Sequence, residues 1–309
     1  MIELELSRRG FLMAGLAAAA GVGFGEGMAW GRTRAPILRR IPATGEELPV
    51  IGLGTSGTFD VGSAPEERAG LAEVLNSFFE NGGKLIDSSP MYGQAETVVG
   101  ALLDSMNPRP PVFVATKVWT DGKQAGIEQM QDSLRLWGVP AADLMQVHNL
   151  RDWKTHLATL RDWKEDGRVR YIGITTSHGR FHAEMESLMR TEPIDFVQFS
   201  YSLDERETEK RLLPLAAERG IATLINRPFA RGGMFRKTRG KPLPDWSGEF
   251  DCRSWAQFFL KFVVGHPAVT CVIPATSKAN HVRDNLGAGF GGLPDEAMRR
   301  RMLQHYESL

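Results

Sequence analysis

Short apolar runs alternate along this chain with longer stretches whose apolar residues recur at helical spacing. The alternation occurs eight times, and the short runs are apolar throughout, which is typical of parallel strands covered on both faces. Eight such repeats favour closure into a (β/α)8 barrel over an open sheet. The sequence therefore predicts an α/β fold, a TIM barrel. The expected strands are residues 50–55, 84–88, 112–118, 144–149, 171–176, 196–202, 222–228 and 270–276, and the expected helices include residues 66–81, 96–106, 126–137, 155–166, 181–190, 208–219 and 254–264.

A further element precedes the first of these strands. Residues 37–49 contain the turn signal Thr44-Gly45 and predict an N-terminal β-hairpin that closes the barrel floor. No linker interrupts the chain after this hairpin, so we expect residues 30–309 to form a single domain. One domain of this length is ordinary for an α/β barrel.

The glycines at the end of the first strand match a known spacing. Gly52, Gly54 and Gly57 fit the G-x-G-x-x-G pattern of dinucleotide-binding sites. That pattern works when its last glycine opens a helix whose N-terminus holds a pyrophosphate. Here residues 58–65 intervene before the helical pattern begins. We therefore interpret the glycines as a tight strand exit at the barrel mouth rather than a Rossmann site.

The first 29 residues have a different composition. Ser7-Arg8-Arg9-Gly10-Phe11-Leu12 precedes a stretch rich in alanine and glycine, and small residues at 27–29 offer a cleavage site. The segment resembles a twin-arginine (Tat) signal peptide, which implies an exported, periplasmic protein. The apolar part is shorter than the roughly 20 residues needed to span a bilayer, so we expect no stable membrane span. A frayed or amphipathic N-terminus is the alternative.

Charge and cysteine content exclude some classes of partner. Lysine plus arginine and aspartate plus glutamate each number 37, so the formal net charge is zero. A neutral chain has no overall field to attract a polyanion, and we expect no nucleic-acid partner. We expect Cys252 and Cys271 to be unpaired, although an oxidising compartment would permit a bond between them. The sequence predicts no metal site.

Four polar residues fall at or just after three consecutive strand ends, where a parallel barrel gathers side chains at one mouth. They are Asp87, Tyr92, Lys117 and His148. A tyrosine can deliver a proton to a carbonyl oxygen, but its ordinary pKa near 10 is too high for easy release at neutral pH. We expect Lys117 to lower the pKa of Tyr92, with Asp87 holding the lysine in place. A neutral His148 would donate a hydrogen bond to the substrate carbonyl. Each residue alone also fits an ordinary turn, cap or surface position.

Several separate motifs resemble the aldo-keto reductase family: IDSSPMYGQAETVVG, ATKVW, DLMQVHN, GRVRYIGITT, DFVQFSY, INRPF and CVIPATSKANHVRDN. They occur in the family's order and cover nearly all of residues 37–290. The resemblance implies that Tyr92 is the general acid, that Lys117 and Asp87 tune it, and that His148 positions the carbonyl. It also implies that a reduced nicotinamide supplies hydride.

The resemblance further implies a cofactor site for NADP, with NAD as an alternative. Asn226 stands where many relatives have a tyrosine that stacks on the nicotinamide, and Arg227 and Phe229 are candidates to compensate. His281 stands where many relatives have an arginine for the 2′-phosphate. The residues expected at the cofactor are Gly54, Thr55, Asp87, Thr175, Thr176, Gln198, Arg227, Phe229, Ser277, Lys278, His281 and Asn285.

These observations predict an NAD(P)H-dependent oxidoreductase that reduces an aldehyde or ketone to an alcohol. Two alternatives stay open: a non-catalytic, nicotinamide-binding partner protein that senses redox state, and a Schiff-base lyase that uses Lys117. The expected partners are a small-molecule carbonyl substrate and the twin-arginine export machinery, and the expected state is a monomer.

Overall fold

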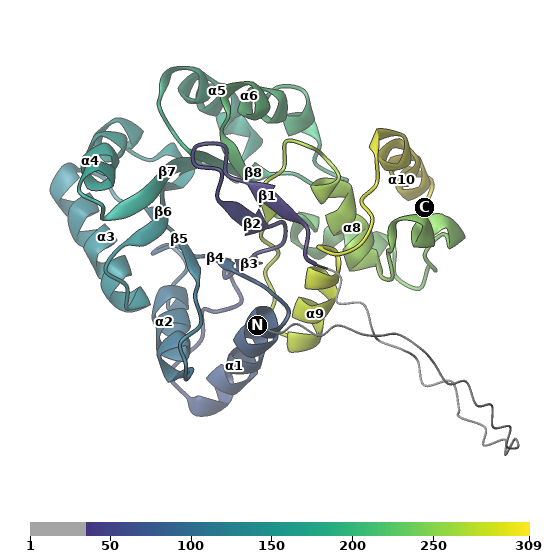
Figure 1. Cartoon of the computed structure of the whole chain (residues 1–309), viewed down its shortest axis with the longest axis horizontal. Coiled ribbons are helices and arrows are strands. Elements are labelled where there is room, and N and C mark those ends of the chain that lie inside the picture. The colour runs from purple at the N-terminus through teal and green to yellow at the C-terminus, as the bar shows by residue number, and fades with distance from the viewer. Residues whose placement is uncertain (1–34) are drawn as a thin grey trace, which may run out of the picture. The chain divides into compact units, whose positions relative to one another are not determined.

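The computed structural model describes residues 35–309, and the predicted signal peptide at residues 1–29 lies outside them. Within the described chain, eight parallel strands follow one another in sequence order around one sheet (Figure 1). Parallel bridges from Ile51 to Val272 and from Gly54 to Ala275 join the first strand region to the last. The predicted (β/α)8 barrel is therefore confirmed. Its strands are β3 (Leu53–Gly54), β4 (Leu85–Asp87), β5 (Phe113–Val118), β6 (Ala142–Val147), β7 (Val169–Thr175), β8 (Phe196–Ser200), β9 (Ala222–Asn226) and β10 (Cys271–Val272).

Most strands end earlier than the apolar runs suggested. β6 stops at Val147 because a 3-10 turn, His148–Leu150, follows it, with Asn149 in the left-handed region at φ 53°. β9 stops at Asn226 because Arg227 has φ 51°. A non-glycine residue in this region is strained, and such residues concentrate at functional sites. The early ends therefore mark candidate functional loops at the C-terminal ends of these strands.

Helices cover the outside of the barrel, each one following the strand that precedes it in the chain (Figure 1). All of the expected helices occur, although the one expected at 208–219 begins only at Leu212, after a 3-10 turn. Two further helices were not predicted, α7 (Gly233–Lys237) and α10 (Glu296–Ser308). The other helices are α1 (Pro65–Glu80), α2 (Ala95–Ser105), α3 (Lys123–Trp137), α4 (Trp153–Glu165), α5 (His182–Thr191), α6 (Leu212–Arg219), α8 (Trp255–Val264) and α9 (Ala279–Gly287).

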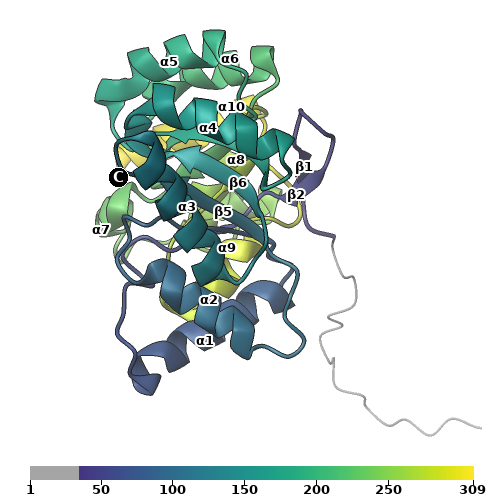
Figure 2. The same ribbon diagram turned by 90° about the vertical axis from the view of Figure 1, so that its left-hand side faces the viewer.

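The N-terminal hairpin closes one end of the barrel. Its strands, β1 (Leu38–Arg40) and β2 (Glu47–Pro49), pair antiparallel. Ile41 and Leu48 are fully buried in the same apolar cluster as the residues that point into the barrel. The Thr44 hydroxyl lies 2.6 Å from the hydroxyl of Tyr171 on β7. The predicted floor is therefore confirmed, and Figure 2 shows the hairpin and α7 at opposite ends of the barrel.

Aromatic rings fill the barrel above this floor. Tyr171 lies 6.0 Å from Phe113 and 5.5 Å from Phe196, measured between ring centroids. Cys271 is buried in the same cluster, and both cysteines are unpaired, as expected. Because the lower barrel is packed solid, polar chemistry is confined to the opposite, C-terminal mouth.

The glycines after the first strand serve close packing and not a dinucleotide helix. A Cβ atom on Gly54 would lie 2.7 Å from the carbonyl oxygen of Ile273, so β3 approaches the last strand too closely for a side chain. The next helix begins at Pro65, well after Gly57. The interpretation as a tight strand exit is confirmed. In residues 35–309, no helix is long and apolar enough to cross a membrane.

Candidate active site

A cavity of about 1110 Å³ opens at the C-terminal mouth of the barrel. Tyr92 and His148 line it on the side of β4 and β6, and Thr276 and Asn285 line it on the side of β10 and α9. Ordinary small-molecule sites have roughly 300 to 1,000 Å³. The cavity therefore has room for a ligand of dinucleotide size beside a smaller one.

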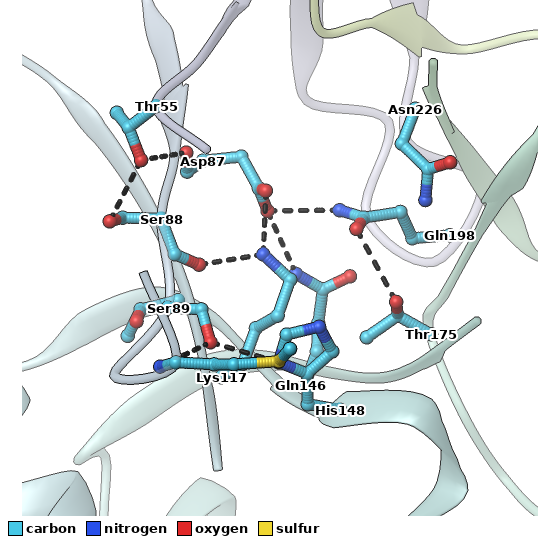
Figure 3. Close-up of polar contacts among 12 residues, drawn as sticks. Thr55, Asp87, Ser88, Ser89, Lys117, Gln146, His148, Thr175, Gln198 and Asn226 are labelled. Atoms are coloured by element: carbon cyan, nitrogen blue, oxygen red, sulfur yellow. Dashed lines mark hydrogen bonds and ion pairs between the residues drawn. The ribbon is translucent and has the colours of Figure 1, made fainter. Parts of the chain in front are cut away.

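The carboxylate of Asp87 is the centre of a buried polar network at the base of this cavity (Figure 3). One oxygen accepts a hydrogen bond from Lys117 Nζ at 2.6 Å, and the other accepts from Gln146 at 3.2 Å and Gln198 at 2.9 Å. Lys117 Nζ also donates to the carbonyl oxygen of Ser88 at 2.6 Å. The network therefore fixes the ammonium in one place.

Lys117 lies next to Tyr92, with its Nζ 5.0 Å from the centroid of the tyrosine ring. Burial lowers the pKa of Lys117, but the charges of Asp87 and Tyr92 raise it, and the net direction is upward. Burial raises the pKa of Tyr92, while the charge of Lys117 and its hydrogen bond lower it, and the net direction is again upward. The prediction that the pKa of Tyr92 is lowered overall is therefore wrong, although Lys117 does lower it as expected. Desolvation, which opposes the charged phenolate, outweighs the ammonium.

His148 lies next to Tyr92 on the cavity wall, with ring centroids 5.7 Å apart and ring planes at 90°. Burial and the charge of Lys117 lower the pKa of His148 to about 3. The imidazole is therefore neutral at physiological pH, as the sequence analysis expected. Its Nδ1 lies 2.9 Å from Ser89 Oγ, which leaves Nε2 as the nitrogen available to a ligand.

The structure brings most of the expected cofactor residues to this cavity but not all. Thr176 is buried behind the wall, where its hydroxyl contacts the backbone of His178. Ser277 and Lys278 are exposed at the start of α9 and do not line the cavity. The expected residues that do line it are Gly54, Thr55, Asp87, Thr175, Gln198, Arg227, Phe229, His281 and Asn285.

Asn226 ties strand ends together. Its side chain accepts a hydrogen bond from Ser200 at 2.7 Å and donates one to the carbonyl of Thr176 at 3.2 Å. The guanidinium of Arg227 donates to both the carbonyl and the hydroxyl of Ser177. Arg227 is thereby held over the mouth, where its charge reaches Tyr92.

Sequence reasoning missed several residues of the site, among them Gln146, Ser89 and Arg231. Neither Ser89 nor Arg231 was singled out from the sequence, yet Ser89 contacts His148 and Arg231 lines the cavity. The position of Ser89 in the sequence, between Asp87 and Tyr92, could have identified it as a residue of the site. In residues 35–309, no group of histidine, cysteine and carboxylate side chains has the arrangement of a metal site.

Comparison with known proteins agrees with this geometry. The model of the Aldo/keto reductase family matches residues 50–301. The aldo-keto reductase YhdN of Bacillus subtilis is 31% identical over 215 residues, which cover 62% of this chain and 62% of YhdN. The methylglyoxal reductase YeaE of Escherichia coli is 28% identical, with 77% of this chain and 84% of YeaE covered.

Solved structures agree on the fold. An aldo-keto reductase from Klebsiella pneumoniae, solved in complex with NADPH, superposes with a TM-score of 0.71 over 88% of this chain and 95% of its own, at 24% identity. Because the family model spans most of the chain, the protein belongs to the aldo/keto reductase family. The expected class, an oxidoreductase that reduces carbonyl compounds, is thereby confirmed.

Proposed function

We propose that this protein is an NAD(P)H-dependent carbonyl reductase in which Tyr92 is the proton donor, Lys117 and Asp87 support it, and His148 orients the substrate. The observation that carries these roles is the placement of a phenol and a neutral imidazole on one cavity wall, beside a buried ammonium. NADP is the proposed cofactor, with NAD as the alternative.

The Tyr92 phenol is protonated at neutral pH, and the charge of Lys117, which lowers the pKa of the phenol against the effect of burial, favours release of that proton. His148 Nε2 donates a hydrogen bond to the carbonyl oxygen and holds it near the Tyr92 hydroxyl. When bound, a reduced nicotinamide supplies hydride to the carbonyl carbon. As negative charge grows on the oxygen, Tyr92 transfers its proton there, and the ammonium of Lys117 stabilises the resulting phenolate.

The residues present fit a dinucleotide. The cavity runs from Tyr92 to α9, and its cationic side chains, Arg227 and Arg231, suit the phosphates. His281 and the buried Asn285 line the far end, where an adenosine moiety would lie. These contacts support NADP without excluding NAD.

The two alternative functions find less support. A Schiff-base lyase needs a lysine that releases its proton easily, but the pKa of Lys117 is raised and its amine is held by Asp87 and Ser88. A redox sensor without catalysis would not need the proton donor, the ammonium and the imidazole in one arrangement.

A turnover assay with a panel of aldehydes and ketones tests this function. The wild type should consume NADPH or NADH with at least one substrate, and Tyr92→Phe should lower kcat by about 10²- to 10⁴-fold with cofactor affinity unchanged. Phenylalanine keeps the ring and removes only the hydroxyl. Equal turnover by the two proteins would exclude Tyr92 as the proton donor, and binding of NADPH without turnover of any substrate would favour the redox sensor.

We further propose that residues 1–29 are a twin-arginine signal peptide and that the protein acts as a monomer in the periplasm. The support is the Arg8-Arg9 pair before an alanine-rich stretch. Replacing both arginines by lysine should retain the full chain in the cytoplasm, as measured by cell fractionation. The same distribution for the wild type and the double variant would exclude this route.

A further inference from the structure

We infer that Ser89 is a positioning residue that holds neutral His148 in the tautomer with its proton on Nε2. The inference rests on the proposed function for its consequence, because His148 can hydrogen-bond to a carbonyl oxygen only when Nε2 carries the proton. Its physical basis, the buried contact between Ser89 Oγ and Nδ1 of His148, does not depend on that function.

The side chains of Ser89 and His148 are buried and in contact with each other. Ser89 is fully buried, and His148 is 4% exposed. Ser89 Oγ lies 2.9 Å from Nδ1 of His148 and accepts a hydrogen bond from the backbone N–H of Met91 at 3.1 Å. A buried hydroxyl with one lone pair so engaged still has a proton to donate. Within residues 35–309, Nδ1 of His148 is the only acceptor in contact with that hydroxyl.

The charge state of His148 decides the direction of this hydrogen bond. Because the pKa of His148 is about 3, the ring is neutral and has one donor and one acceptor nitrogen. If Nδ1 carried the proton, Ser89 Oγ would accept two hydrogen bonds, and its own proton would be buried without a partner. That arrangement is costly in a low-dielectric interior. Nδ1 therefore accepts, and Nε2 carries the proton.

The remaining nitrogen faces the cavity. Nε2 of His148 has no hydrogen-bond partner in residues 35–309, and His148 lines the cavity together with Tyr92. The segment that carries Ser89 also provides Asp87 and the Ser88 carbonyl, both of which bind Lys117 (Figure 3). One short loop therefore sets the ammonium, the phenol and the tautomer of the imidazole together.

Nitrogen NMR of the full chain labelled with ¹⁵N-histidine tests this inference directly. Between about pH 5 and 8, where an ordinary histidine titrates, wild-type His148 should show an unprotonated Nδ1, a protonated Nε2 and no titration. Ser89→Ala should give a mixture of tautomers or a protonated Nδ1, and Ser89→Thr, which keeps the hydroxyl, should restore the wild-type signal. His148→Gln assigns the resonance.

Ser88→Ala is the matched control, because Ser88 is the neighbouring buried serine and its hydroxyl contacts Thr55 instead of His148. The control should keep the wild-type tautomer. A protonated Nδ1 in the wild type, or an unchanged tautomer in Ser89→Ala, would overturn the inference. The wild-type spectrum alone suffices for the first of these outcomes, so the test does not depend on how well a variant folds.

Kinetics give a second readout. Ser89→Ala should lower kcat/KM for carbonyl reduction by about ten- to a hundred-fold, the size seen when a partner that orients a metal-ligating histidine is removed. Affinity for NADPH should not change, and Ser89→Thr should recover most of the loss. If the tautomer is fixed as inferred but no substrate is reduced, the proposed function fails and the inference stands. If reduction occurs and Nδ1 is protonated, the inference fails alone.

Discussion

Burial decides the protonation states of the residues at the mouth, and burial is what the sequence shows least well. The residue types at Asp87, Tyr92, Lys117 and His148 were sufficient to predict that these side chains lie together at the barrel mouth. The residue types were not sufficient to predict the net direction in which the pKa of Tyr92 shifts, because that direction depends on how much water the folded chain removes from the phenol. The contact between Ser89 and His148 also depends on two loops meeting in space.

The neutral His148 makes stability depend on pH. Its pKa is about 3 in the folded chain and near its ordinary value of 6.5 in the unfolded chain. Between these values the unfolded chain binds more protons, so stability falls as the pH is lowered from about 6.5, by up to about 1.4 kcal/mol per pH unit for this one group. His148→Gln should therefore lose less stability than the wild type between pH 6.5 and 4, as measured by urea unfolding.

Unfolding of the wild type and His148→Gln above about pH 7 provides the control. Above about pH 7 neither the folded nor the unfolded chain protonates the histidine appreciably, so the difference in unfolding free energy between wild type and variant should be constant there. Parallel curves throughout the acid range would mean that His148 does not remain neutral in the folded protein.

At the scale of elements, apolar patterning located the strands and most helices but not their ends. α10 was missed because only Met302 and Tyr306 are buried along it, too few to form an apolar stripe. α7 is only five residues long and lies in a glycine-containing loop. Strand ends were overextended where a polar or strained residue, such as Asn149, turns the backbone inside an otherwise apolar run.

A buried carboxyl group on α2 connects three elements. Glu96 accepts hydrogen bonds from Thr116 on β5 and, at 3.0 Å each, from Ser133 and Trp137 on α3. Thr116 is the neighbour of Lys117, so this network also helps to place β5. Glu96→Ala should lower the free energy of unfolding by at least about 3 kcal/mol, because three buried donors lose their acceptor.

Chemical denaturation measures this loss. Glu96→Gln keeps one acceptor oxygen and should retain much of the stability. The exposed Glu128 on α3 provides the control, since in residues 35–309 its side chain hydrogen-bonds only with Gln124, and Glu128→Ala should change stability by less than about 0.5 kcal/mol. A Glu96→Ala protein as stable as that control would mean that the network contributes little.

For the whole molecule, alternation of strands and helices was sufficient to predict barrel closure and the hairpin floor. Both follow from the same constraint, because each parallel strand must cover its apolar faces and an open barrel end would expose the rings around Tyr171. The cavity itself was less predictable. Arg231 reaches it from a loop with three left-handed non-glycine residues, Arg227, Ala230 and Arg231, which no periodic pattern reveals.

The charge at the mouth gives the last prediction. Arg231 lines the cavity, is exposed and has no hydrogen bond or ion pair in residues 35–309, so its charge is free to contact a phosphate. A ligand that binds only the folded chain stabilises it, by about 2.7 kcal/mol when its concentration is a hundred times Kd. NADPH should therefore raise the Tm by a few degrees.

Arg231→Ala should weaken NADPH binding about five-fold, the effect of losing one exposed ion pair, and added salt should reduce the difference. Arg236→Ala removes an equally exposed charge from α7 that does not line the cavity, and it should bind NADPH as the wild type does. Equal weakening in both variants would indicate a general effect of net charge, and no weakening in either would place the phosphates elsewhere.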